Sequence, residues 1–290
     1  MLLLYEHPVS SYAQKVKIAL REKGVPFEAV VPEDLGTGRT DTPFAAANPR
    51  AEVPVLIDGE ARIFESTVIM EYVEERWPEP PLLPPRGDPA ARAFARVTED
   101  VCDTQYEAVN WGFGEVLWFR RAAGALADRL RAQAAEQTRV IQEWLAGRLG
   151  DAEWFGGERF GWADAAAVPM VNRSVHYGLE PPSGSPLARW HARVRERPSV
   201  AQTFAEFNAA VTNRAAGAEA YATGAKRREC RDHRLEWMVK SGGIEVVLAG
   251  LRDGNIRFPW PGTVGSGRFF HDGSGGDVVE PRQNRASDPA

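Results

Sequence analysis

The sequence predicts a chain of two main domains, the first α/β and the second all-helical. The first 77 residues alternate short apolar runs, typical of strands, with longer stretches of helical periodicity. A proline-rich segment follows, and beyond it the strand patterns end and long helical stretches take over. A length of 290 residues also favours two domains over one.

The first domain opens with a strand-helix-strand pattern. Residues 2–5 form a short apolar run that predicts a strand. Residues 12–23 carry apolar side chains on one helical face, and Gly24 stands where a helix ends. Residues 27–31 are rich in β-branched side chains and predict a second strand. A short helix is expected at residues 44–47.

A hairpin and a helix complete this domain at about residue 77. Residues 53–57 and 62–64 flank Asp58-Gly59, a dipeptide suited to a tight hairpin turn. Ser66 then caps a helix that runs to about residue 76. A parallel strand pair extended by a hairpin needs helices on both faces of its sheet, so an α/β sandwich of residues 1–77 is expected.

Proline separates the two domains. Residues 77–85 hold five prolines in nine positions, which neither a helix interior nor a central strand tolerates. We therefore expect a semi-rigid linker at residues 78–89. The remaining boundaries are a helical-bundle domain at 90–213, a helical extension at 214–260 with one helix over 219–240, and a disordered tail at 261–290.

Composition excludes several classes of function. The formal charge of −5 argues against nonspecific nucleic-acid binding, which needs a cationic face. Cys102 and Cys230 lie far apart without metal-ligand spacing, so neither a disulfide framework nor a metal site is expected. No apolar run approaches the roughly 18 residues that span a bilayer. The start of the chain lacks the basic flank of a signal peptide, so we expect a cytoplasmic protein without a membrane partner.

Two serines stand where the first long helix begins. Ser10 and Ser11 lie beside the unpaired N–H groups and the positive end of the helix dipole, a place that stabilises anions such as a thiolate. The alternative is that one serine only caps the helix, because Ser is a favoured capping residue.

Two further features border the hairpin. A proline at position 54 opens a central strand. A cis Val53-Pro54 bond would turn the Val53 backbone outward, where it could pair with an extended peptide. The alternative is a proline that is simply tolerated at the end of a strand. Glu65 and Ser66 stand at a strand-to-helix junction. Their carboxylate, hydroxyl and helix amides match the ammonium and carboxylate of an amino-acid head, although a simply capped helix would look the same.

These segments together resemble the glutathione transferase superfamily. The resemblance rests on residues 10–16 (SSYAQKV), 48–56 (NPRAEVPVL) and Glu65-Ser66, and it covers roughly residues 1–212. It implies a thioredoxin-like first domain, a cis Pro54, and glutathione held by Val53, Pro54, Glu65 and Ser66. It is similar to bacterial, serine-containing members, here with a C-terminal extension.

The resemblance implies a reaction as well as a ligand. Ser10, with Ser11 as second choice, would donate a hydrogen bond to the glutathione sulfur, whereas a cysteine there would permit mixed-disulfide chemistry. The expected activity is attack of the activated thiol on a small apolar electrophile, by conjugation, dehalogenation, ether cleavage or isomerisation, typical of detoxification. Tyr12, Trp111 and Trp118 are the candidate electrophile pocket, although an aromatic stripe is more often core. A non-catalytic binding protein and a reductase using Cys102 are the alternatives.

Other implications concern assembly and departures from the family pattern. Members usually dimerise, so a homodimer is expected, with Glu99 and Asp100 facing the partner's glutathione.

Gly161 replaces the usual cap three residues before Asp164, which keeps a structural role. Glu52 leaves the glycyl carboxylate of glutathione without a partner, for which Arg39 or Arg50 are candidates. The charged run at residues 226–234 reads better as an amphipathic helix docked on the bundle than as an anion-binding patch.

Overall fold

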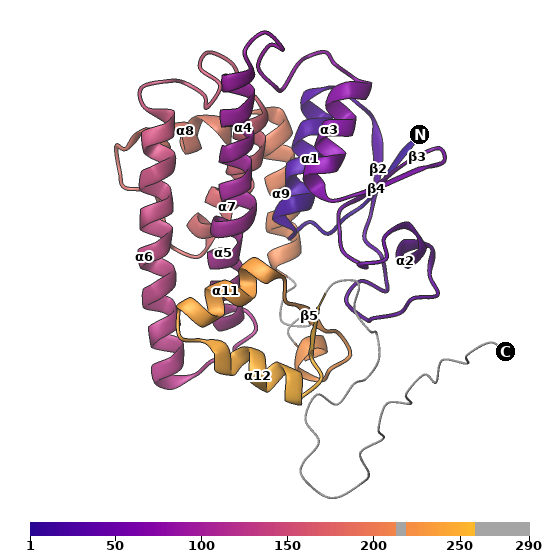
Figure 1. Ribbon diagram of the computed structural model, residues 1–290, viewed down its shortest axis with the longest axis vertical. Helices are drawn as coiled ribbons and strands as arrows, with labels where there is room; N and C mark the ends of the chain where they lie inside the picture. The colour runs from indigo at the N-terminus through magenta and orange to yellow at the C-terminus, as the bar shows by residue number, and fades with distance from the viewer. Residues whose placement is uncertain (213–218, 259–290) are drawn as a thin grey trace, which may run out of the picture.

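The computed structural model describes residues 1–212 and 219–258 (Figure 1). Its first domain is built on a four-stranded sheet of order β2-β1-β3-β4. Strand β1 pairs in parallel with β2, and the pairs β1–β3 and β3–β4 are antiparallel. The strands are β1 Leu2–Tyr5, β2 Phe27–Val30, β3 Val55–Asp58 and β4 Ala61–Phe64.

Helices cover both faces of this sheet, as the sequence predicts. Alternate residues of each strand point to opposite faces, so Leu4 and Leu56 join the core beneath helices α1 (Ser11–Glu22) and α3 (Ser66–Arg76). Val55 instead packs with Phe44 of helix α2 (Pro43–Ala47) on the other face. In Figure 1, α1 and α3 lie between the sheet and the helical domain.

The hairpin turn lies one residue later than its sequence suggests. Asp58 pairs with Ala61, so the two-residue loop is Gly59-Glu60 and not Asp58-Gly59. Gly59 takes the positive φ of 58° that such a turn requires. The Asp58 side chain also accepts a hydrogen bond of 2.8 Å from the Tyr72 hydroxyl of α3.

The second domain is all-helical, and α6 runs along its outer side (Figure 1). Its first long helix contains a π-helical segment, η1, in which one extra residue is accommodated. The same helix ends at Leu117, earlier than the pattern over residues 90–123 indicates. The elements are α4 Pro89–Val101, η1 Cys102–Tyr106, α5 Glu107–Leu117, α6 Gly124–Leu149, α7 Trp162–His176, α8 Pro186–Val194 and α9 Pro198–Thr212.

The extension packs against the lower end of the helical domain and also reaches the first domain (Figure 1). It holds α11 (Asp232–Lys240), α12 (Ile244–Arg252) and a parallel pair of short strands, β5 Arg228–Glu229 and β6 Ile256–Arg257. The single helix expected over 219–240 is wrong, because Gly224 at φ 76° breaks it and β5 follows. The tail expected at 261–290 lies outside the described residues.

One glycine allows the extension to dock closely. The Trp237 ring of α11 lies directly on Gly112 of α5, where any Cβ would overlap it. Trp237 and Trp111 belong to a core cluster of their own, separate from the core shared by the first two domains. The extension is therefore part of the folded body over its described residues.

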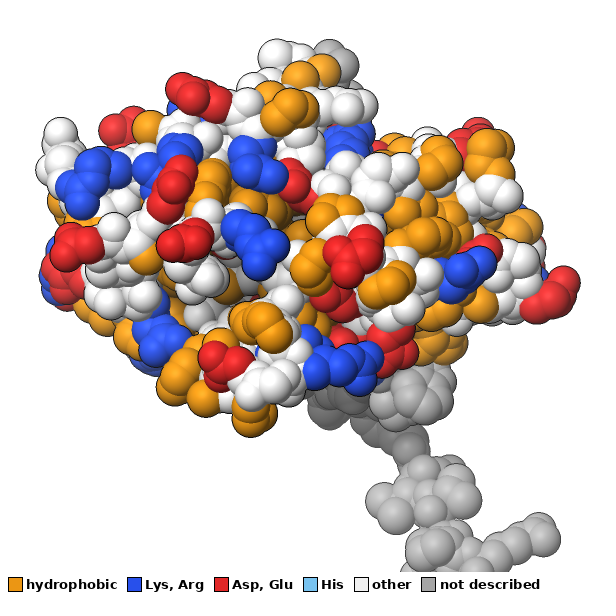
Figure 2. All heavy atoms as spheres, turned by 90° about the horizontal axis from the view of Figure 1, so that it is seen from above, with side chains coloured by type: hydrophobic (Ala, Val, Ile, Leu, Met, Phe, Trp, Pro, Cys, Tyr) orange, Lys and Arg blue, Asp and Glu red, His pale blue; other side chains and the backbone are white. Residues whose placement is uncertain are grey.

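The surface offers no simple clue to function. Figure 2 shows basic and acidic side chains interspersed over one end of the molecule. Within the described ranges, no helix combines the length and apolar character needed to cross a membrane.

Candidate functional site

A cavity of about 460 Å³ lies where the first domain, the helical domain and the extension meet. A volume of this size is typical of small-ligand sites. The first domain contributes Tyr12, Asn48, Glu52, Val53, Pro54, Glu65, Ser66 and Thr67; the helical domain contributes Arg96, Glu99, Asp100, Asp103 and Thr104; the extension contributes Arg231, Asp232 and His233.

The Val53-Pro54 step presents open backbone to this cavity. The Val53-Pro54 peptide bond is cis, as the resemblance implies. Pro54 stands just before β3 and both residues line the cavity. Among residues 1–212 and 219–258, neither the N–H nor the C=O of Val53 has a hydrogen-bond partner. A peptide-like ligand can therefore pair with this edge.

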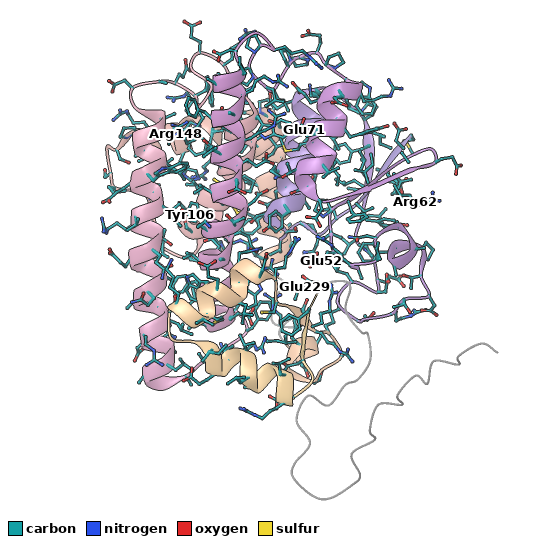
Figure 3. The ribbon with its side chains drawn as sticks, viewed as in Figure 1. Glu52, Arg62, Glu71, Tyr106, Arg148 and Glu229 are labelled. Atoms are coloured by element: carbon teal, nitrogen blue, oxygen red, sulfur yellow. The ribbon has the colours of Figure 1, made fainter. Side chains whose placement is uncertain are left out.

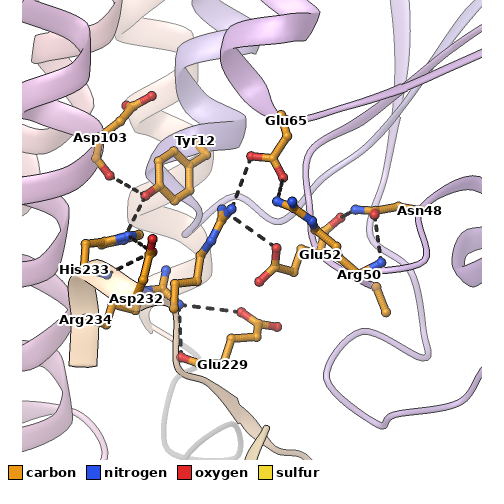
Figure 4. Close-up of polar contacts among 12 residues, drawn as sticks. Tyr12, Asn48, Arg50, Glu52, Glu65, Asp103, Glu229, Asp232, His233 and Arg234 are labelled. Carbon is orange, nitrogen blue, oxygen red and sulfur yellow. Dashed lines mark hydrogen bonds and ion pairs between the residues drawn. The ribbon is translucent and has the colours of Figure 1, made fainter. Parts of the chain in front are cut away.

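Glu65 and Ser66 lie beside that edge, at the N-terminus of α3. The expectation that Ser66 caps this helix is wrong: Glu65 is the N-cap residue, no side chain within the described residues makes a capping bond, and Ser66 is the first helical residue. Glu65 precedes the helix with φ 68°, a conformation that costs a non-glycine residue about 1–3 kcal/mol and that clusters at functional sites. Its carboxylate meets two guanidinium groups, from Arg50 and from Arg231 of the extension (Figure 4). Ser66 is buried, and Ser66 and Thr67, the first residues of α3, both line the cavity, so the N-terminus of this helix lies at the cavity wall.

Ser10 and Ser11 lie at the N-terminus of α1, although neither is among the residues that line the cavity. Ser10 is the capping residue, and its Oγ accepts a hydrogen bond of 3.3 Å from the Ala13 N–H. Its own proton remains available to another acceptor. Ser11 is buried in the first turn of α1, a turn that has no acidic side chain.

Tyr12 lines the cavity, and its hydroxyl proton already takes part in a hydrogen bond within the protein. Its hydroxyl donates to the backbone C=O of Asp103 in η1 at 2.6 Å, and His233 Nε2 lies 3.4 Å from the same oxygen (Figure 4). Burial, together with the nearby Glu107 and Asp103 carboxylates, raises the pKa of Tyr12 well above its usual value. Tyr12 is thus a neutral phenol that is committed to a protein partner.

A buried charge cluster joins the first two domains below the cavity. Lys15 of α1 is fully buried, and its Nζ lies 2.6 Å from Glu99 and 2.5 Å from Asp103. Glu99 also accepts hydrogen bonds from Thr67 and from the Trp162 indole. Burial raises the pKa of Asp103 to about 6, even though Lys15 acts in the opposite direction. The carboxylate of Glu99 thus has its hydrogen-bond partners within this chain, although the family resemblance implies that it faces the glutathione of a partner subunit.

The extension brings charged residues that the sequence pattern did not assign to a site. Arg234 donates to both carboxylate oxygens of buried Glu107, at 3.1 and 2.7 Å, and His233 Nε2 lies 2.9 Å from Glu107 Oε2. Burial opposes ionisation of Glu107, but Arg234 and His233 outweigh it and hold its pKa far below the usual range. Figure 3 places Glu229 of β5 beside Glu52 of the first domain. Only the mixture of Arg, Glu, Asp and His within residues 226–234 hinted at this role.

Comparison with known proteins identifies the fold. The chain matches the family model of the glutathione S-transferase N-terminal domain over residues 4–81 and that of the C-terminal domain over residues 116–198. It is 33% identical over 204 residues to glutathione S-transferase U28 of Arabidopsis thaliana, an alignment covering 68% of this chain and 85% of that protein. The chain belongs to the glutathione S-transferase family.

Solved structures agree with this assignment. A glutathione S-transferase from Methylobacterium radiotolerans, determined in complex with glutathione sulfonate, is 32% identical with a TM-score of 0.59, covering 70% of this chain and 93% of that one. A glutathione S-transferase from Rhodospirillum rubrum is 31% identical with a TM-score of 0.59, covering 70% and 91%. The predicted thioredoxin-like and helical domains are confirmed, and residues 219–258 lie outside both matched family models.

The structure separates the three aromatic residues suggested as an electrophile pocket in this glutathione S-transferase family member. Tyr12 lines the cavity. Trp111 is buried beneath the guanidinium groups of Arg228 and Arg234, in the core that includes the extension. Trp118 packs against Arg173 and Tyr177, and neither tryptophan lines the cavity.

The remaining sequence candidates have clear places. The Asp164 carboxylate accepts from the Gly161 N–H at 3.0 Å and from the Trp190 indole at 2.7 Å, which is the structural role expected of it. Arg39 is exposed and pairs with neighbouring Asp41, and Arg50 pairs with Glu65. Neither arginine lines the cavity.

Proposed function

We propose that this protein is a glutathione transferase that binds glutathione in the cavity between its three parts and activates the thiol for attack on a small electrophile. The observation that supports this most is the conjunction of an unpaired Val53 backbone with Glu65 and Ser66 on one cavity wall. An extended tripeptide would pair through its cysteinyl backbone with Val53, and its γ-glutamyl head would meet Glu65 and Ser66.

Activation of the thiol is assigned to Ser10, with Ser11 as the second choice. A thiol of pKa about 8.5 is only a few per cent ionised at neutral pH. Lowering that pKa by about two units requires roughly 2.7 kcal/mol. One charge-assisted hydrogen bond of about 1.5–3 kcal/mol, with about 0.3–1 kcal/mol from the dipole of α1, is sufficient. Tyr12 is a poorer candidate, because its proton is donated to the Asp103 carbonyl.

The reaction needs no covalent enzyme intermediate. The thiolate attacks the electrophile directly, and conjugation, dehalogenation, ether cleavage and isomerisation all begin from that step. Apolar contact for the electrophile comes from Tyr12, Val53 and Pro54, because Trp111 and Trp118 lie elsewhere. We further propose a cytoplasmic homodimer with a role in detoxification.

Titration calorimetry of the full chain with glutathione tests the binding step. We expect saturable binding at millimolar ligand or below, and at least a tenfold loss of affinity in Glu65→Gln, since a charge-assisted contact contributes about 1.5–3 kcal/mol. The matched control is Glu60→Gln, which removes an exposed glutamate from the neighbouring hairpin. Turnover of a chlorodinitrobenzene then tests catalysis. Binding without turnover would favour the non-catalytic alternative, and no binding at all would contradict the proposal.

A further inference from the structure

The cavity has an excess of negative charge on the wall that would receive glutathione. The first domain contributes Glu52 and Glu65 to the lining but no lysine or arginine. Glutathione carries a carboxylate at each end and one ammonium group, so this wall suits the ammonium and repels carboxylates. Ser66 and the amides of α3 can satisfy the head carboxylate. The glycyl carboxylate has no partner in this domain.

The extension places one guanidinium group at this position. Arg231 lies immediately before α11, with its guanidinium 3.8 Å from Glu52 and 3.4 Å from Glu65. These two residues lie on either side of Val53-Pro54 in the chain, and both line the cavity with Arg231. A cation at this point faces the backbone edge that would hold the tripeptide.

Most of the hydrogen-bonding capacity of Arg231 is unused. Its guanidinium has five N–H donors, and over the described residues it makes one hydrogen bond, the long one to Glu65. Arg234, three residues later, instead donates both to Glu107 and to the Glu229 carbonyl. The Arg231 side chain is also only 21% exposed, so water satisfies it incompletely. Free donors in a half-buried guanidinium at a cavity wall suit a carboxylate ligand.

The other basic side chains near the cavity are already engaged. Arg96 lines it but pairs with Glu71 at 2.9 and 2.5 Å. His233 lies between Glu107 and Asp232. Lys15 lies buried beneath Glu99 and Asp103 and does not line the cavity. Among the described residues, Arg231 is therefore the arginine of the lining that uses the fewest of its donors, one of five against three of five for Arg96.

The extension is held firmly enough to keep Arg231 in place. Arg257 of β6 donates to the backbone carbonyls of Arg50 and Ala51 in the first domain, at 2.7 and 2.9 Å. Arg234 anchors the start of α11 to Glu107 of α5. Arg231 thus lies between anchors on both domains, which hold its backbone next to the cavity.

We propose that the extension completes the glutathione site, with Arg231 binding the glycyl carboxylate of glutathione. This rests on the proposed function. It makes Arg231, which the extension supplies, a residue that determines specificity for a ligand with a free carboxylate at that end.

Calorimetric titration of the full chain with glutathione and with its glycyl monoethyl ester tests this directly. We expect Arg231→Ala to weaken glutathione binding by about tenfold or more, the usual effect of one charge-assisted contact. The same change should affect the ester by less than about threefold, because the ester has no glycyl carboxylate to lose. Arg231→Lys should keep part of the affinity, because it retains the charge without the planar fork.

Lys240→Ala is the matched control, since it removes one exposed cation from the far end of α11. Unchanged or tighter glutathione binding in Arg231→Ala would overturn the inference, and so would equal losses for glutathione and the ester. If the variant fails to fold, the unmodified protein decides the matter, because it must bind glutathione about tenfold more tightly than the ester. Failure of the unmodified protein to bind either ligand would instead refute the proposed function.

Discussion

The two sides of the cavity present different kinds of chemical group to a ligand. On the side of the first domain, the lining includes backbone groups of Val53 that have no hydrogen-bond partner among the described residues, together with Glu65 at a positive φ. On the side of the extension it consists of the side chains of Arg231, Asp232 and His233, and Arg234 ties the start of α11 to Glu107. A backbone surface is fixed by local geometry, whereas a charged one depends on partners far away in the sequence.

This difference predicts that the extension side is the more easily disrupted. The largest effect is expected for Glu107→Gln, which leaves the buried Arg234 guanidinium with only the 4.0 Å ion pair to Glu229. Removing one partner of a buried ion pair costs about 3–5 kcal/mol, which should appear in the free energy of unfolding measured with urea. Glu143→Gln is the matched control: it breaks an exposed pair with Arg139, which contributes about 0–1 kcal/mol. Equal effects of the two changes would contradict the account.

The same pair sets the pH dependence of the extension. Because the folded-state pKa of Glu107 lies below its ordinary 4.5, its contribution is complete above that pH and is lost as the pH falls toward the folded-state pKa. The stability difference between the unmodified protein and Glu107→Gln should therefore narrow in acid below about pH 4.5. A difference that widened in acid would mean that Arg234 and His233 do not stabilise the ionised form.

A smaller effect is expected where the extension meets α5. Gly112→Val would drive the Trp237 ring from its place, and overpacking of this kind costs about 1–3 kcal/mol. Limited proteolysis should then cleave the extension faster than in the unmodified protein, while the first domain stays protected. Gly147→Val on α6 is the control, since nothing lies within 4 Å of a Cβ built there. Equal rates of cleavage in both variants would show that this contact does not hold the extension.

The smallest effect is expected for Cys102→Ala, which concerns neither side of the cavity. Cys102 is fully buried, and burial raises the pKa of its thiol well above the usual value, so it is a packed apolar group and not a nucleophile. We expect about 1 kcal/mol of lost stability and unchanged turnover of glutathione with an electrophile. Loss of turnover would favour the reductase alternative and place the reacting sulfur in the protein itself.

The two sides also differ in how far the sequence predicts them. The hairpin, the Ser10 cap of α1 and the Val53-Pro54 step were predicted because each depends on neighbours in the chain, whereas the cap of α3 was predicted one residue late, at Ser66 and not Glu65. The turn was predicted one residue early because Asp58 pairs with Ala61 across the hairpin, a register that the Asp58-Gly59 dipeptide alone does not reveal. The assignments of Ser10 and Ser11 to the sulfur remain predictions.

The extension side could not be predicted in the same way. Residues 226–234 have the composition of an amphipathic helix docked on the bundle. Pairing with β6 makes Arg228–Glu229 a strand, and ion pairs with Glu52, Glu65, Glu107 and Glu115, more than a hundred residues earlier, hold the segment against the rest of the chain. The role of the aromatic stripe of α5 also depends on residues far away in the sequence, because Trp111 could line a pocket or support a docked segment. Periodicity cannot distinguish these two roles, because both need one apolar helical face.

Ionisation of the bound thiol is the most direct test of the central claim that this cavity activates glutathione. Thiolate absorbance of the glutathione complex, followed over pH, should give a pKa at least one unit below the ordinary value of about 8.5. Ser10→Ala should raise that pKa by one unit or more, and an equal rise in Ser11→Ala alone would move the assignment by one residue. A bound thiol that titrates at its ordinary pKa, in the unmodified protein and in both variants, would contradict the account.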